Sequence, residues 1–532
     1  MDQPFLVTGQ PSRDLATLAG WHADWRDLKV AVLGLGVTGF AAADTLVELG
    51  ANVLVVAGSA GEHHRELLGV IGGAFVQSSG EQGAPAELLD FDPELVVVSP
   101  GYHPDHPLLL WAGERGIPIW GDIELAWRLR DKVVRDDGTP ADWICVTGTN
   151  GKTTTTQLTA SMLVAGGVRA APAGNIGVPV LDAIRDPGGF DALVIELSSY
   201  QLHWMHREMD VAGSPAQIAP LASVCLNLAE DHYDWHGSPE AYRDAKAKVY
   251  ANVRIACVYN LADDATRIMV QDAEVQEGAR AIGFGATVPG PSDVGIVDGI
   301  LVDRAFLDDR RHAALELATL DDLHAAGLAA PHSVANVLAA AALARAADVP
   351  PAAIRDAIRG FRVDAHRTEL VAESGGISWV DDSKATNAHA AHAALSAFES
   401  VVWIAGGQLK GVDPDPLVKR NTGRLRAAIL VGTDRSLLRS AFERHAPGVL
   451  LIEVDENDTG QVMPAAVRAA ASVAQPGDVV LLAPSAASFD QFADYADRGR
   501  RFADAVRQHL ATQYLGGNAG DDDPPSTPPA AG

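Results

Sequence analysis

The sequence predicts an α/β protein of several domains, each built around a mainly parallel β-sheet. The chain has 532 residues, whereas a single hydrophobic core stops growing at about 250–300 residues, so two to four domains are expected. Short apolar runs typical of buried strands alternate with longer helical patterns, which is the order found in parallel sheets. This alternation starts anew in three stretches of the chain.

The first stretch opens with an apolar run at residues 29–33, which indicates a buried strand. A glycine-rich turn follows, and then a helical pattern over residues 41–49. Two further strands are expected, at residues 52–56 and 95–98. The last of these strands ends in Ser-Pro-Gly, a sequence that favours a turn.

The second stretch begins after a charged loop at residues 130–142. A strand at residues 143–146 runs into another glycine-rich turn and a helix from residue 153. Two more strands and an alanine-rich helix are expected, at residues 192–195, 223–226 and 333–347. The third stretch repeats the pattern with strands near residues 401–404, 428–431 and 479–482.

These stretches predict three domains, at residues 1–122, 123–363 and 364–515. The remaining residues, 516–532, consist largely of Gly, Asp, Pro, Ser and Ala. Such a composition buries little apolar surface, so a disordered tail is expected.

The charge and cysteine content exclude several classes of protein. A formal net charge of −28 argues against nucleic acid or an anionic membrane as the main partner, because both bind basic patches. The three cysteines are widely spaced and predict reduced, buried thiols rather than a disulfide framework. No secretory signal and no apolar run long enough to span a bilayer is visible, so a cytoplasmic location is expected.

A phosphate-binding loop is the most informative local motif. A strand, the sequence Gly148-Thr149-Asn150-Gly151-Lys152-Thr153 and a helix follow one another. Backbone amides of such a turn cradle phosphate oxygens, the lysine neutralises phosphate charge, and a hydroxyl of Thr153 or Thr154 can bind Mg²⁺. The general motif places glycine at position 146, where this chain has Val146, so the loop is a shorter variant.

A second glycine-rich turn, Gly34-Leu35-Gly36-Val37-Thr38-Gly39, follows the first strand. Its spacing matches a dinucleotide fingerprint, which also requires an acid at the end of the second strand to bind the ribose. That strand ends in Val-Ala-Gly, with Ala57 at the position of the acid. The missing acid weakens the hypothesis of an NAD-dependent dehydrogenase.

From the phosphate loop onward the chain resembles the Mur ligase family, whose members add amino acids to a bacterial cell-wall precursor. Gly-Thr-Asn-Gly-Lys-Thr is that family's short form of the loop, and further family segments follow in order. They are residues 174–177, 196–202, 227–232, 242–246, His332 with Asn336, residues 366–367 and 382–387. The segment Asp-Ser-Lys-Ala-Thr-Asn at residues 382–387, with residues 406–411 and 484–492, resembles the members that add D-glutamate.

The resemblance implies three domains: a Rossmann-like N-terminal domain for a UDP-sugar, a central ATP-binding phosphate-loop domain and a Rossmann-like C-terminal domain for the amino acid. It also implies the reaction. The γ-phosphoryl group of ATP activates the carboxylate of UDP-N-acetylmuramoyl-L-alanine, and the amine of D-glutamate attacks the acyl phosphate through a tetrahedral intermediate. ADP and phosphate are released.

The resemblance further implies two Mg²⁺ ions as cofactors, with ATP as co-substrate. The metal ligands would be Thr153, Glu196, His232 and a carbamylated Lys246. Lys152, His232 and Lys246 would act in catalysis. Transfer of a phosphoryl group rests mainly on positioning and charge neutralisation, which metals, lysines and amides supply.

The family's remaining contacts are carried over residue by residue. ATP would be bound by the loop residues 148–154 together with Asn336, Arg367 and Asp382. The UDP-substrate would be bound by Val37, Thr38, Ser99, Gly101, Asn175 and His232, and the residue that contacts uridine is undefined because Ala57 replaces the usual acid. D-Glutamate would be bound by Lys384, Thr386, Lys410, Ser488 and Tyr495.

Other functions remain as alternatives. Relatives that add L-alanine, a diamino acid or a dipeptide, or glutamate to folate, fit residues 382–387 and Lys410 less well. A nucleotide hydrolase without an amino-acid acceptor would explain the phosphate loop alone, and a non-enzymatic UDP-sugar-binding protein would leave the expected metal ligands unexplained. The expected partners are small molecules, and a monomer is expected.

Overall fold

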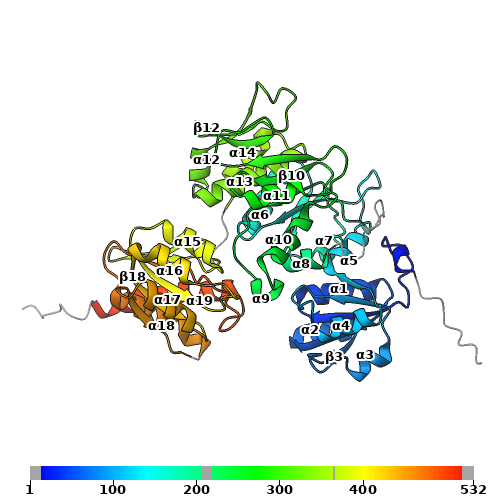
Figure 1. The fold of residues 1–532 in the computed structure, drawn as a ribbon, viewed down its shortest axis with the longest axis horizontal. Helices are drawn as coiled ribbons and strands as arrows, with labels where there is room; N and C mark the ends of the chain where they lie inside the picture. Colours follow the sequence, from blue (N-terminus) through cyan, green and yellow to red (C-terminus); the bar gives the residue numbers. More distant parts are fainter. Residues whose placement is uncertain (1–13, 206–216, 363–365, 457, 518–532) are drawn as a thin grey trace, which may run out of the picture. The chain divides into compact units, whose positions relative to one another are not determined.

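The computed structural model describes residues 14–205, 217–362, 366–456 and 458–517. It forms three β-sheets and divides into two compact units (Figure 1). Met1–Leu228 and Glu240–Arg362 make up unit 1, whereas Ala229–Pro239 and Val363–Gly532 make up unit 2. The tail expected at residues 516–532 lies outside the described residues from position 518 onward. The predicted domain boundaries stay predictions.

The first sheet of unit 1 has five parallel strands in the order β3-β2-β1-β4-β5. The strands are β1 Lys29–Leu35, β2 Asn52–Ala60, β3 Ala74–Gln77, β4 Leu95–Val98 and β5 Ile119–Gly121. The helices are α1 Val37–Glu48, α2 Glu62–Ile71, α3 Ala86–Phe91, α4 Pro107–Glu114 and α5 Asp122–Arg128, after a 3₁₀ turn at Leu15–Thr17. The strand order reverses between β1 and β4, and ligands bind at such a point in parallel sheets.

The second sheet of unit 1 has nine strands in the order β14-β13-β12-β11-β10-β9-β6-β8-β7. Its parallel part comprises β6 Asp142–Thr147, β7 Ala170–Gly174, β8 Ala192–Glu196, β9 Ala222–Cys225, β10 Ala256–Asn260, β11 Arg280–Phe284 and β12 Asp293–Val297. The strands β13 Ile300–Asp303 and β14 Leu315–Thr319 continue it in antiparallel fashion. This antiparallel extension was not expected from the sequence.

Several helices of this part of unit 1 pack against the nine-stranded sheet. The helices of this part are α6 Lys152–Ala165, α7 Val180–Ala183, α8 Ser199–Trp204, α10 Pro239–Ala247, α11 Asp264–Gln271, α12 Leu320–Ala325, α13 Pro331–Ala346 and α14 Pro351–Gly360, with a 3₁₀ turn at Lys248–Tyr250. The alanine-rich α13 is buried along most of its length. Small alanine side chains let α13 approach both α6 and the sheet closely.

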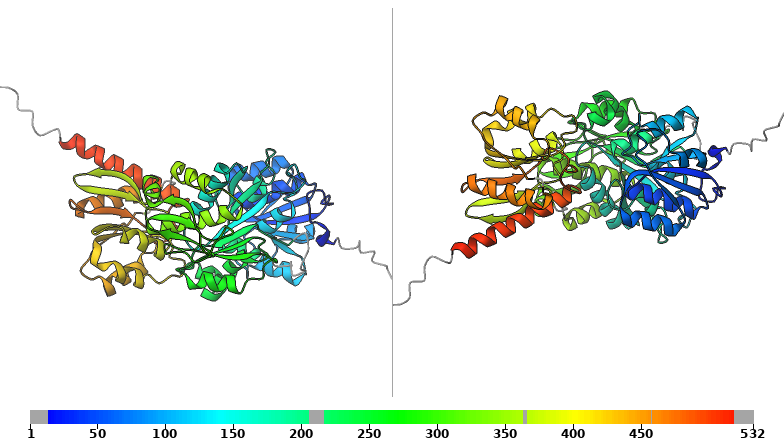
Figure 2. Two further views of the ribbon diagram at one scale, coloured as in Figure 1. Left: turned by 90° about the horizontal axis from the view of Figure 1, so that it is seen from above. Right: turned by 90° about the horizontal axis from the view of Figure 1, so that it is seen from below.

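Unit 2 contains a six-stranded sheet in the order β15-β16-β20-β17-β18-β19, in which only β15 is antiparallel to its neighbour. Its strands are β15 Glu369–Ser374, β16 Ile377–Asp381, β17 Val401–Gly406, β18 Leu425–Val431, β19 Leu450–Glu453 and β20 Val479–Leu482. Its helices are α9 Tyr233–His236, α15 Ala388–Ser396, α16 Asp415–Asn421, α17 Ser436–His445, α18 Thr459–Val473 and α19 Tyr495–Gly517, with a 3₁₀ turn at Thr422–Arg424. The long α19, red in Figure 2, packs on α18 and on β15 and β16.

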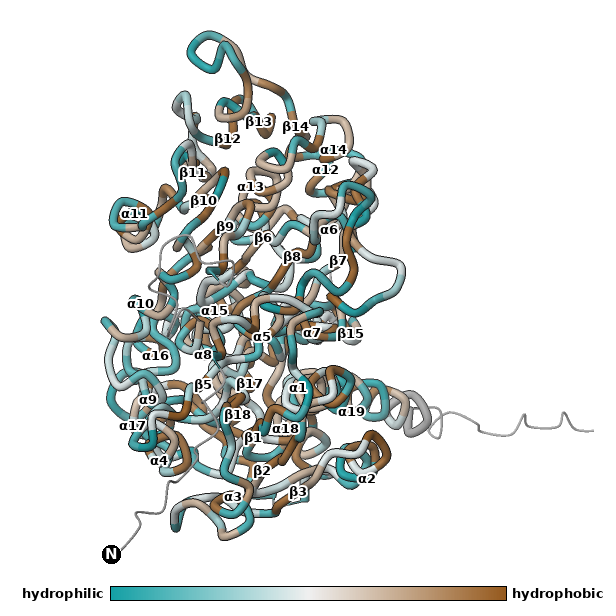
Figure 3. Tube along the Cα trace, turned by 90° about the vertical axis from the view of Figure 1, so that its right-hand side faces the viewer, coloured by the Kyte–Doolittle hydropathy of each residue, from teal (hydrophilic) through white to brown (hydrophobic). Residues whose placement is uncertain are grey.

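The fold class and the strands expected from the sequence are confirmed. Figure 3 colours apolar strands such as β18 mostly brown, in agreement with their burial. The first helix begins at Val37, earlier than expected, because Gly36 serves as its N-cap. The three cysteines are free and buried, and burial raises the pKa of Cys225 to about 11. Within the described part of the chain, no helix has the length and apolar character required to cross a membrane.

Candidate active site

The phosphate loop connects the end of β6 to the start of α6 in unit 1. Gly148 and Gly151 have positive φ angles of 143° and 87°. A Cβ atom at Gly151 would lie 2.3 Å from Oδ1 of Asn336, so glycine lets the loop lie directly against α13. The helix α6 has no side-chain cap at its N-terminus, which is typical of a helix end that binds phosphate.

Asn227 fixes the path of the loop, a role that the sequence analysis did not assign. Its Oδ1 accepts a hydrogen bond from the amide of Asn150 at 2.8 Å, and its Nδ2 donates to the carbonyl of Asn150 at 3.0 Å. The carbonyl of Asn227 accepts from the amide of Thr149 at 2.9 Å. A single side chain thus forms hydrogen bonds with both the amide and the carbonyl of Asn150, as a neighbouring β-strand would.

Two lysines converge on one carbonyl oxygen of the loop. Nζ of Lys152 and Nζ of Lys246 each lie 2.9 Å from the oxygen of Gly148. Lys152 also donates to the carbonyl of Thr149 at 2.9 Å, and Lys246 is only 2% exposed. Two ammonium groups on one oxygen repel each other, so this point of the loop is strongly electropositive.

Glu196 places a buried carboxylate near the same loop, at the end of β8. It is 2% exposed, and its Oε1 accepts a hydrogen bond from Nδ2 of Asn175 at 2.9 Å. Its Oε2 is buried and has no hydrogen-bond partner among the described residues. A buried carboxylate oxygen without a donor is costly unless a cation binds it. Glu196 therefore fits a hard cation such as Mg²⁺, and the hydroxyls of the phosphate-loop residues Thr153 and Thr154, expected to bind that cation, are buried as well.

The first sheet of unit 1 contains a cavity of about 720 Å³ at the carboxyl ends of its strands. Its lining combines the β1 turn, the end of β2 and the loop after β4, and includes Gly34, Gly36, Ala57, Ser59, His64, Tyr102 and His106. Oγ of Ser99 is buried without a partner in the described part of the chain. Val37 is exposed at the first position of α1, Thr38 is half-buried beside it and Gly101 is exposed.

Tyr102 and His106 form a rigid wall of this cavity. Their rings pack edge to face with centroids 4.8 Å apart. Nε2 of His106 lies 3.1 Å from the carbonyl of Ser79, while its Nδ1 accepts a hydrogen bond from the amide of Leu108 at 3.2 Å. Both ring nitrogens are occupied, so the histidine holds Tyr102 in place. Burial raises the pKa of Tyr102 above its usual value.

In unit 2, Asp231 organises two residues around a buried carboxylate. Lys410 forms an ion pair with Oδ1 of Asp231 at 2.6 Å, and Nδ2 of Asn387 donates to Oδ2 at 3.3 Å. The neighbouring His232 has a left-handed backbone, with φ of 55°. Lys410 and His232 are among the site residues expected from the sequence, whereas Asp231 is not.

A second lysine of unit 2 contacts a tyrosine. Nζ of Lys384 donates to the hydroxyl of Tyr495 at 2.9 Å and lies 4.4 Å from the ring centroid. Ser488 is buried, and Thr386 is half-buried. The expected D-glutamate residues therefore include one lysine held by a hydroxyl and another held by a carboxylate.

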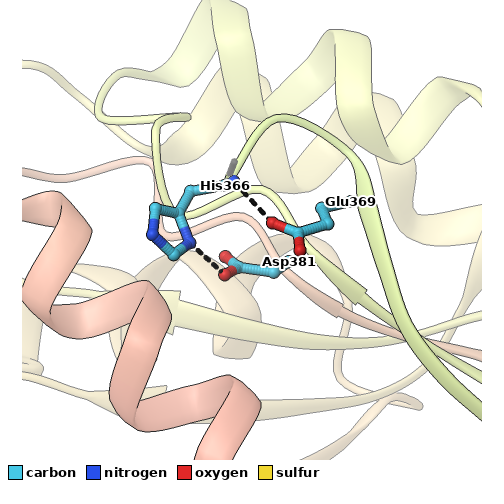
Figure 4. Close-up of side chains that lie close together, drawn as sticks. All are labelled: His366, Glu369 and Asp381. Carbon is cyan, nitrogen blue, oxygen red and sulfur yellow. Dashed lines mark hydrogen bonds and ion pairs between the residues drawn. The ribbon is translucent and has the colours of Figure 1, made fainter. Parts of the chain in front are cut away.

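Arg367 and Asp382 lie at the same end of the β15–β16 pair. The amide of Thr368 donates to Oδ1 of Asp382 at 3.1 Å, and burial raises the pKa of Asp382 to about 7. Beside them, Nδ1 of His366 lies 2.6 Å from Oδ2 of Asp381, and the amide of His366 donates to Glu369 at 2.9 Å (Figure 4). His366, Glu369 and Asp381 could also hold a metal ion, but hydrogen bonds already account for their short distances.

The residues expected at the site from the sequence are mostly charged or polar, and they do not include the side chains that hold them. Asn227, Asp231 and the pair of His366 with Asp381 all act on other protein groups. Asn227, Asp231 and His366 lie inside the segments that carry the family resemblance. Their place in those segments could have indicated that they belong to the site.

Comparisons with known proteins agree with this geometry. The family model of the Mur ligase middle domain matches residues 146–344, and that of the Mur ligase, glutamate ligase domain matches residues 366–486. The UDP-N-acetylmuramoylalanine–D-glutamate ligase of Leifsonia xyli subsp. xyli is 63% identical, with 97% of this chain and 99% of that protein covered. The enzyme of the same name from Streptomyces avermitilis is 50% identical, with 91% and 99% covered.

Solved structures support the fold. The UDP-N-acetylmuramate–alanine ligase of Thermotoga maritima aligns with a TM-score of 0.52 at 18% identity, covering 91% of this chain and 100% of that one. A pseudomurein peptide ligase type C from Methanothermus fervidus aligns with a TM-score of 0.53 at 15% identity, covering 90% and 100%. The two family models and the curated relatives establish that the chain belongs to the Mur ligase family.

Proposed function

We propose that the chain joins D-glutamate to UDP-N-acetylmuramoyl-L-alanine and converts ATP to ADP and phosphate in peptidoglycan precursor synthesis. The observation that carries this proposal is the arrangement around the phosphate loop. There, Lys152 and Lys246 share the carbonyl of Gly148, and Glu196 offers a buried oxygen that has no donor among the residues the structure describes. The names of relatives that are 63% and 50% identical support D-glutamate as the acceptor.

The chemistry explains why these groups are needed. A carboxylate and an amine condense in water only after the carboxylate is activated, and a phosphoryl group from ATP provides that activation. The loop amides and Lys152 would orient the phosphates, and the fixed positive charge would stabilise the charge that develops during transfer. Asn336, which lies against Gly151, would contact the adenine side, and Arg367 and Asp382 would contact the phosphates and ribose.

Thr153, Glu196, His232 and Lys246 would hold two Mg²⁺ ions, which neutralise phosphate charge when bound. Lys246 would do so as a carbamate, formed when carbon dioxide adds to its amine. This change would replace one of two adjacent ammonium groups by an anion and so remove the repulsion at Gly148. Asn175 orients Glu196 through the 2.9 Å hydrogen bond and would also contact the nucleotide-sugar substrate, as would His232.

The cavity of the first sheet would bind the UDP end of the substrate. Val37, Thr38, Ser99 and Gly101 border the β1 turn and would contact the diphosphate, for which Oγ of Ser99 is an unused donor. Ala57 stands where an acidic side chain would otherwise contact uridine. The wall made by Tyr102 and His106 is therefore the best candidate for packing against the uracil ring.

The amino-acid site would lie in unit 2. D-Glutamate carries two carboxylates, which would be bound by Lys384, Thr386, Lys410, Ser488 and Tyr495. The ion pair with Asp231 keeps Lys410 in a defined position before an anionic substrate arrives. A monomeric state and a cytoplasmic location stay predictions that belong to this proposal.

A panel of acceptors tests the function. The full chain is incubated with ATP, Mg²⁺ and UDP-N-acetylmuramoyl-L-alanine, and phosphate release is measured with one amino acid at a time. Release with D-glutamate alone is the expected result. Release with a different amino acid would contradict the specificity, and release without any acceptor would indicate a hydrolase.

A pair of lysine variants localises the acceptor site. Lys410→Ala should raise the KM for D-glutamate at least about tenfold, because an interaction between charged groups is lost. Lys419→Ala, at an exposed position of α16, is the matched control and should leave this KM unchanged. Equal effects of the two variants would refute the assignment of Lys410.

A further inference from the structure

We infer that the pair of His366 and the buried Asp381, covered by Gly499, is a positioning device that holds Arg367 and Asp382 in the geometry needed for ATP. The inference rests on the proposed function, because the roles of Arg367 and Asp382 are part of that proposal. His366 and Asp381 act through these neighbours and are positioning residues.

The backbone on both sides of Arg367 is fixed by residues of the segment that follows β16. The carbonyl of His366, in the peptide before Arg367, accepts a hydrogen bond from the amide of Lys384 at 3.3 Å. The amide of Thr368, in the peptide after Arg367, donates to Oδ1 of Asp382 at 3.1 Å. The side chain of Arg367 makes no hydrogen bond or ion pair with any described residue, so its position depends on these two peptides.

This backbone is strained, and the strain needs an anchor. His366 and Thr368 have φ angles of 66° and 46°, in the left-handed region that residues other than glycine adopt uncommonly, histidine more often than threonine. Two such residues within three positions persist only when the surrounding structure over-determines them. The side chain of His366 provides the contact that holds the turn in this form.

Asp381 anchors both halves of the arrangement, and Figure 4 shows its contact with His366. It is fully buried, its Oδ2 lies 2.6 Å from Nδ1 of His366, and its Oδ1 accepts the amide of Ser383 at 2.9 Å. The first contact fixes the turn that carries Arg367, and the second fixes the turn that carries Asp382. Burial raises the pKa of Asp381, while the hydrogen bond from His366 lowers it.

Helix α19 closes the pair from the outside. A Cβ atom at Gly499 would lie 2.4 Å from Nδ1 of His366 and 2.7 Å from Oδ2 of Asp381, so only glycine fits at this position. The preceding Arg498, which is 1% exposed, donates to the carbonyl and to Oγ of Ser383. The helix therefore clamps the same turn that Asp381 organises.

Three substitutions of His366 test the positioning role by steady-state kinetics of the full chain. His366→Ala loses the ring nitrogen and should raise the KM for ATP at least about tenfold. His366→Asn places an amide nitrogen near the position of Nδ1 and tolerates a left-handed backbone, so it should keep this KM within about threefold of wild type. His366→Gln lacks both properties and should resemble His366→Ala, which keeps the test valid if the alanine variant does not fold.

A merely structural role would give a different pattern. Partial unfolding lowers the fraction of active enzyme, and therefore kcat, without changing the KM for ATP. A positioning role predicts instead that the KM for ATP rises, while the KM for UDP-N-acetylmuramoyl-L-alanine stays unchanged. His445→Ala removes a second histidine–aspartate contact of unit 2, 3.0 Å to Asp415, and as the matched control it should change neither KM. Equal KM values for His366→Ala and wild type, or no rescue by asparagine, would overturn the inference.

Coupling to Arg367 completes the test. In an Arg367→Lys background, which loses the planar guanidinium fork, His366→Ala should raise the KM for ATP by less than about twofold, because the group that it positions is already altered. Multiplicative effects of the two changes would refute positioning. These are ratios between variants, measured with whichever amino acid the wild type uses, so failure of the D-glutamate proposal would leave them readable.

Discussion

Replacing Asp122 by asparagine should stabilise unit 1 by an amount that grows with pH. Asp122 begins α5, is 6% exposed and accepts a hydrogen bond from Nε2 of Gln201 at 2.9 Å. Burial raises its pKa from 3.8 to about 6. Because the folded state holds this proton up to a higher pH than the unfolded state does, ionisation of Asp122 destabilises the fold as the pH rises.

The shifted pKa sets the magnitude. With values of 3.8 and about 6, the penalty is ~1.6 kcal/mol near pH 5 and ~3 kcal/mol near pH 8, at 1.36 kcal/mol per pKa unit. Asp122→Asn removes the titrating group and keeps an acceptor oxygen for Gln201. Its free energy of unfolding, relative to wild type, should therefore increase by ~1.4 kcal/mol between these two pH values. A fixed packing cost of asparagine cancels in this difference.

Urea unfolding followed by tryptophan fluorescence measures this difference, because Trp120 and Trp127 lie in the same core cluster as α5. Asp308→Asn, at an exposed loop position, is the control and should give a difference from wild type that does not vary with pH. The difference in free energy of unfolding between Asp122→Asn and wild type could instead stay constant or fall toward high pH. Either result would refute the claim that burial raises the pKa of Asp122.

Three further predictions concern the proposed reaction. Lys152→Ala should abolish turnover while the circular dichroism spectrum stays native, because the loop loses its charge; near-normal turnover would contradict the role of the loop. Lys246→Ala should be inactive and should regain part of its activity when a short carboxylic acid is added, since the proposed carbamate supplies an anionic oxygen; wild-type activity without the acid would exclude that role. Tyr102→Ala should weaken UDP binding in calorimetry about tenfold through lost stacking, whereas Tyr102→Phe should bind normally; equal affinities of wild type and Tyr102→Ala would place uracil elsewhere.

Local patterns explain why the phosphate loop could be predicted from the sequence. A buried strand, two glycines and Lys152 at the start of a helix are neighbours in the chain, so their arrangement follows from backbone preferences alone. The position of Glu196 at the end of β8 was predictable for the same reason, because the apolar run before it indicates where the strand stops.

The contacts that hold the site depend on distant parts of the chain. Asp231 and Lys410 are far apart in sequence, and the residues around each of them do not indicate that the two form an ion pair. The orphaned oxygen of Glu196 likewise becomes visible only when the packing around it is known. The antiparallel strands β13 and β14 were missed because they are short and separated by turns, a pattern that resembles a loop.

The net charge of the chain has the same sign as the charge of its proposed substrates. Every proposed substrate is an anion, and the chain carries a formal net charge of −28. Long-range attraction therefore does not explain affinity, and the net field opposes the approach of substrates at low ionic strength. The positive groups instead act at short range, each fixed by an oxygen acceptor: Lys152 by Gly148, Lys384 by Tyr495, and Lys410 by Asp231. Fixed positions lower the entropic cost of ordering these side chains on binding. The local attraction by these few lysines therefore exceeds the repulsion by the net charge of the chain.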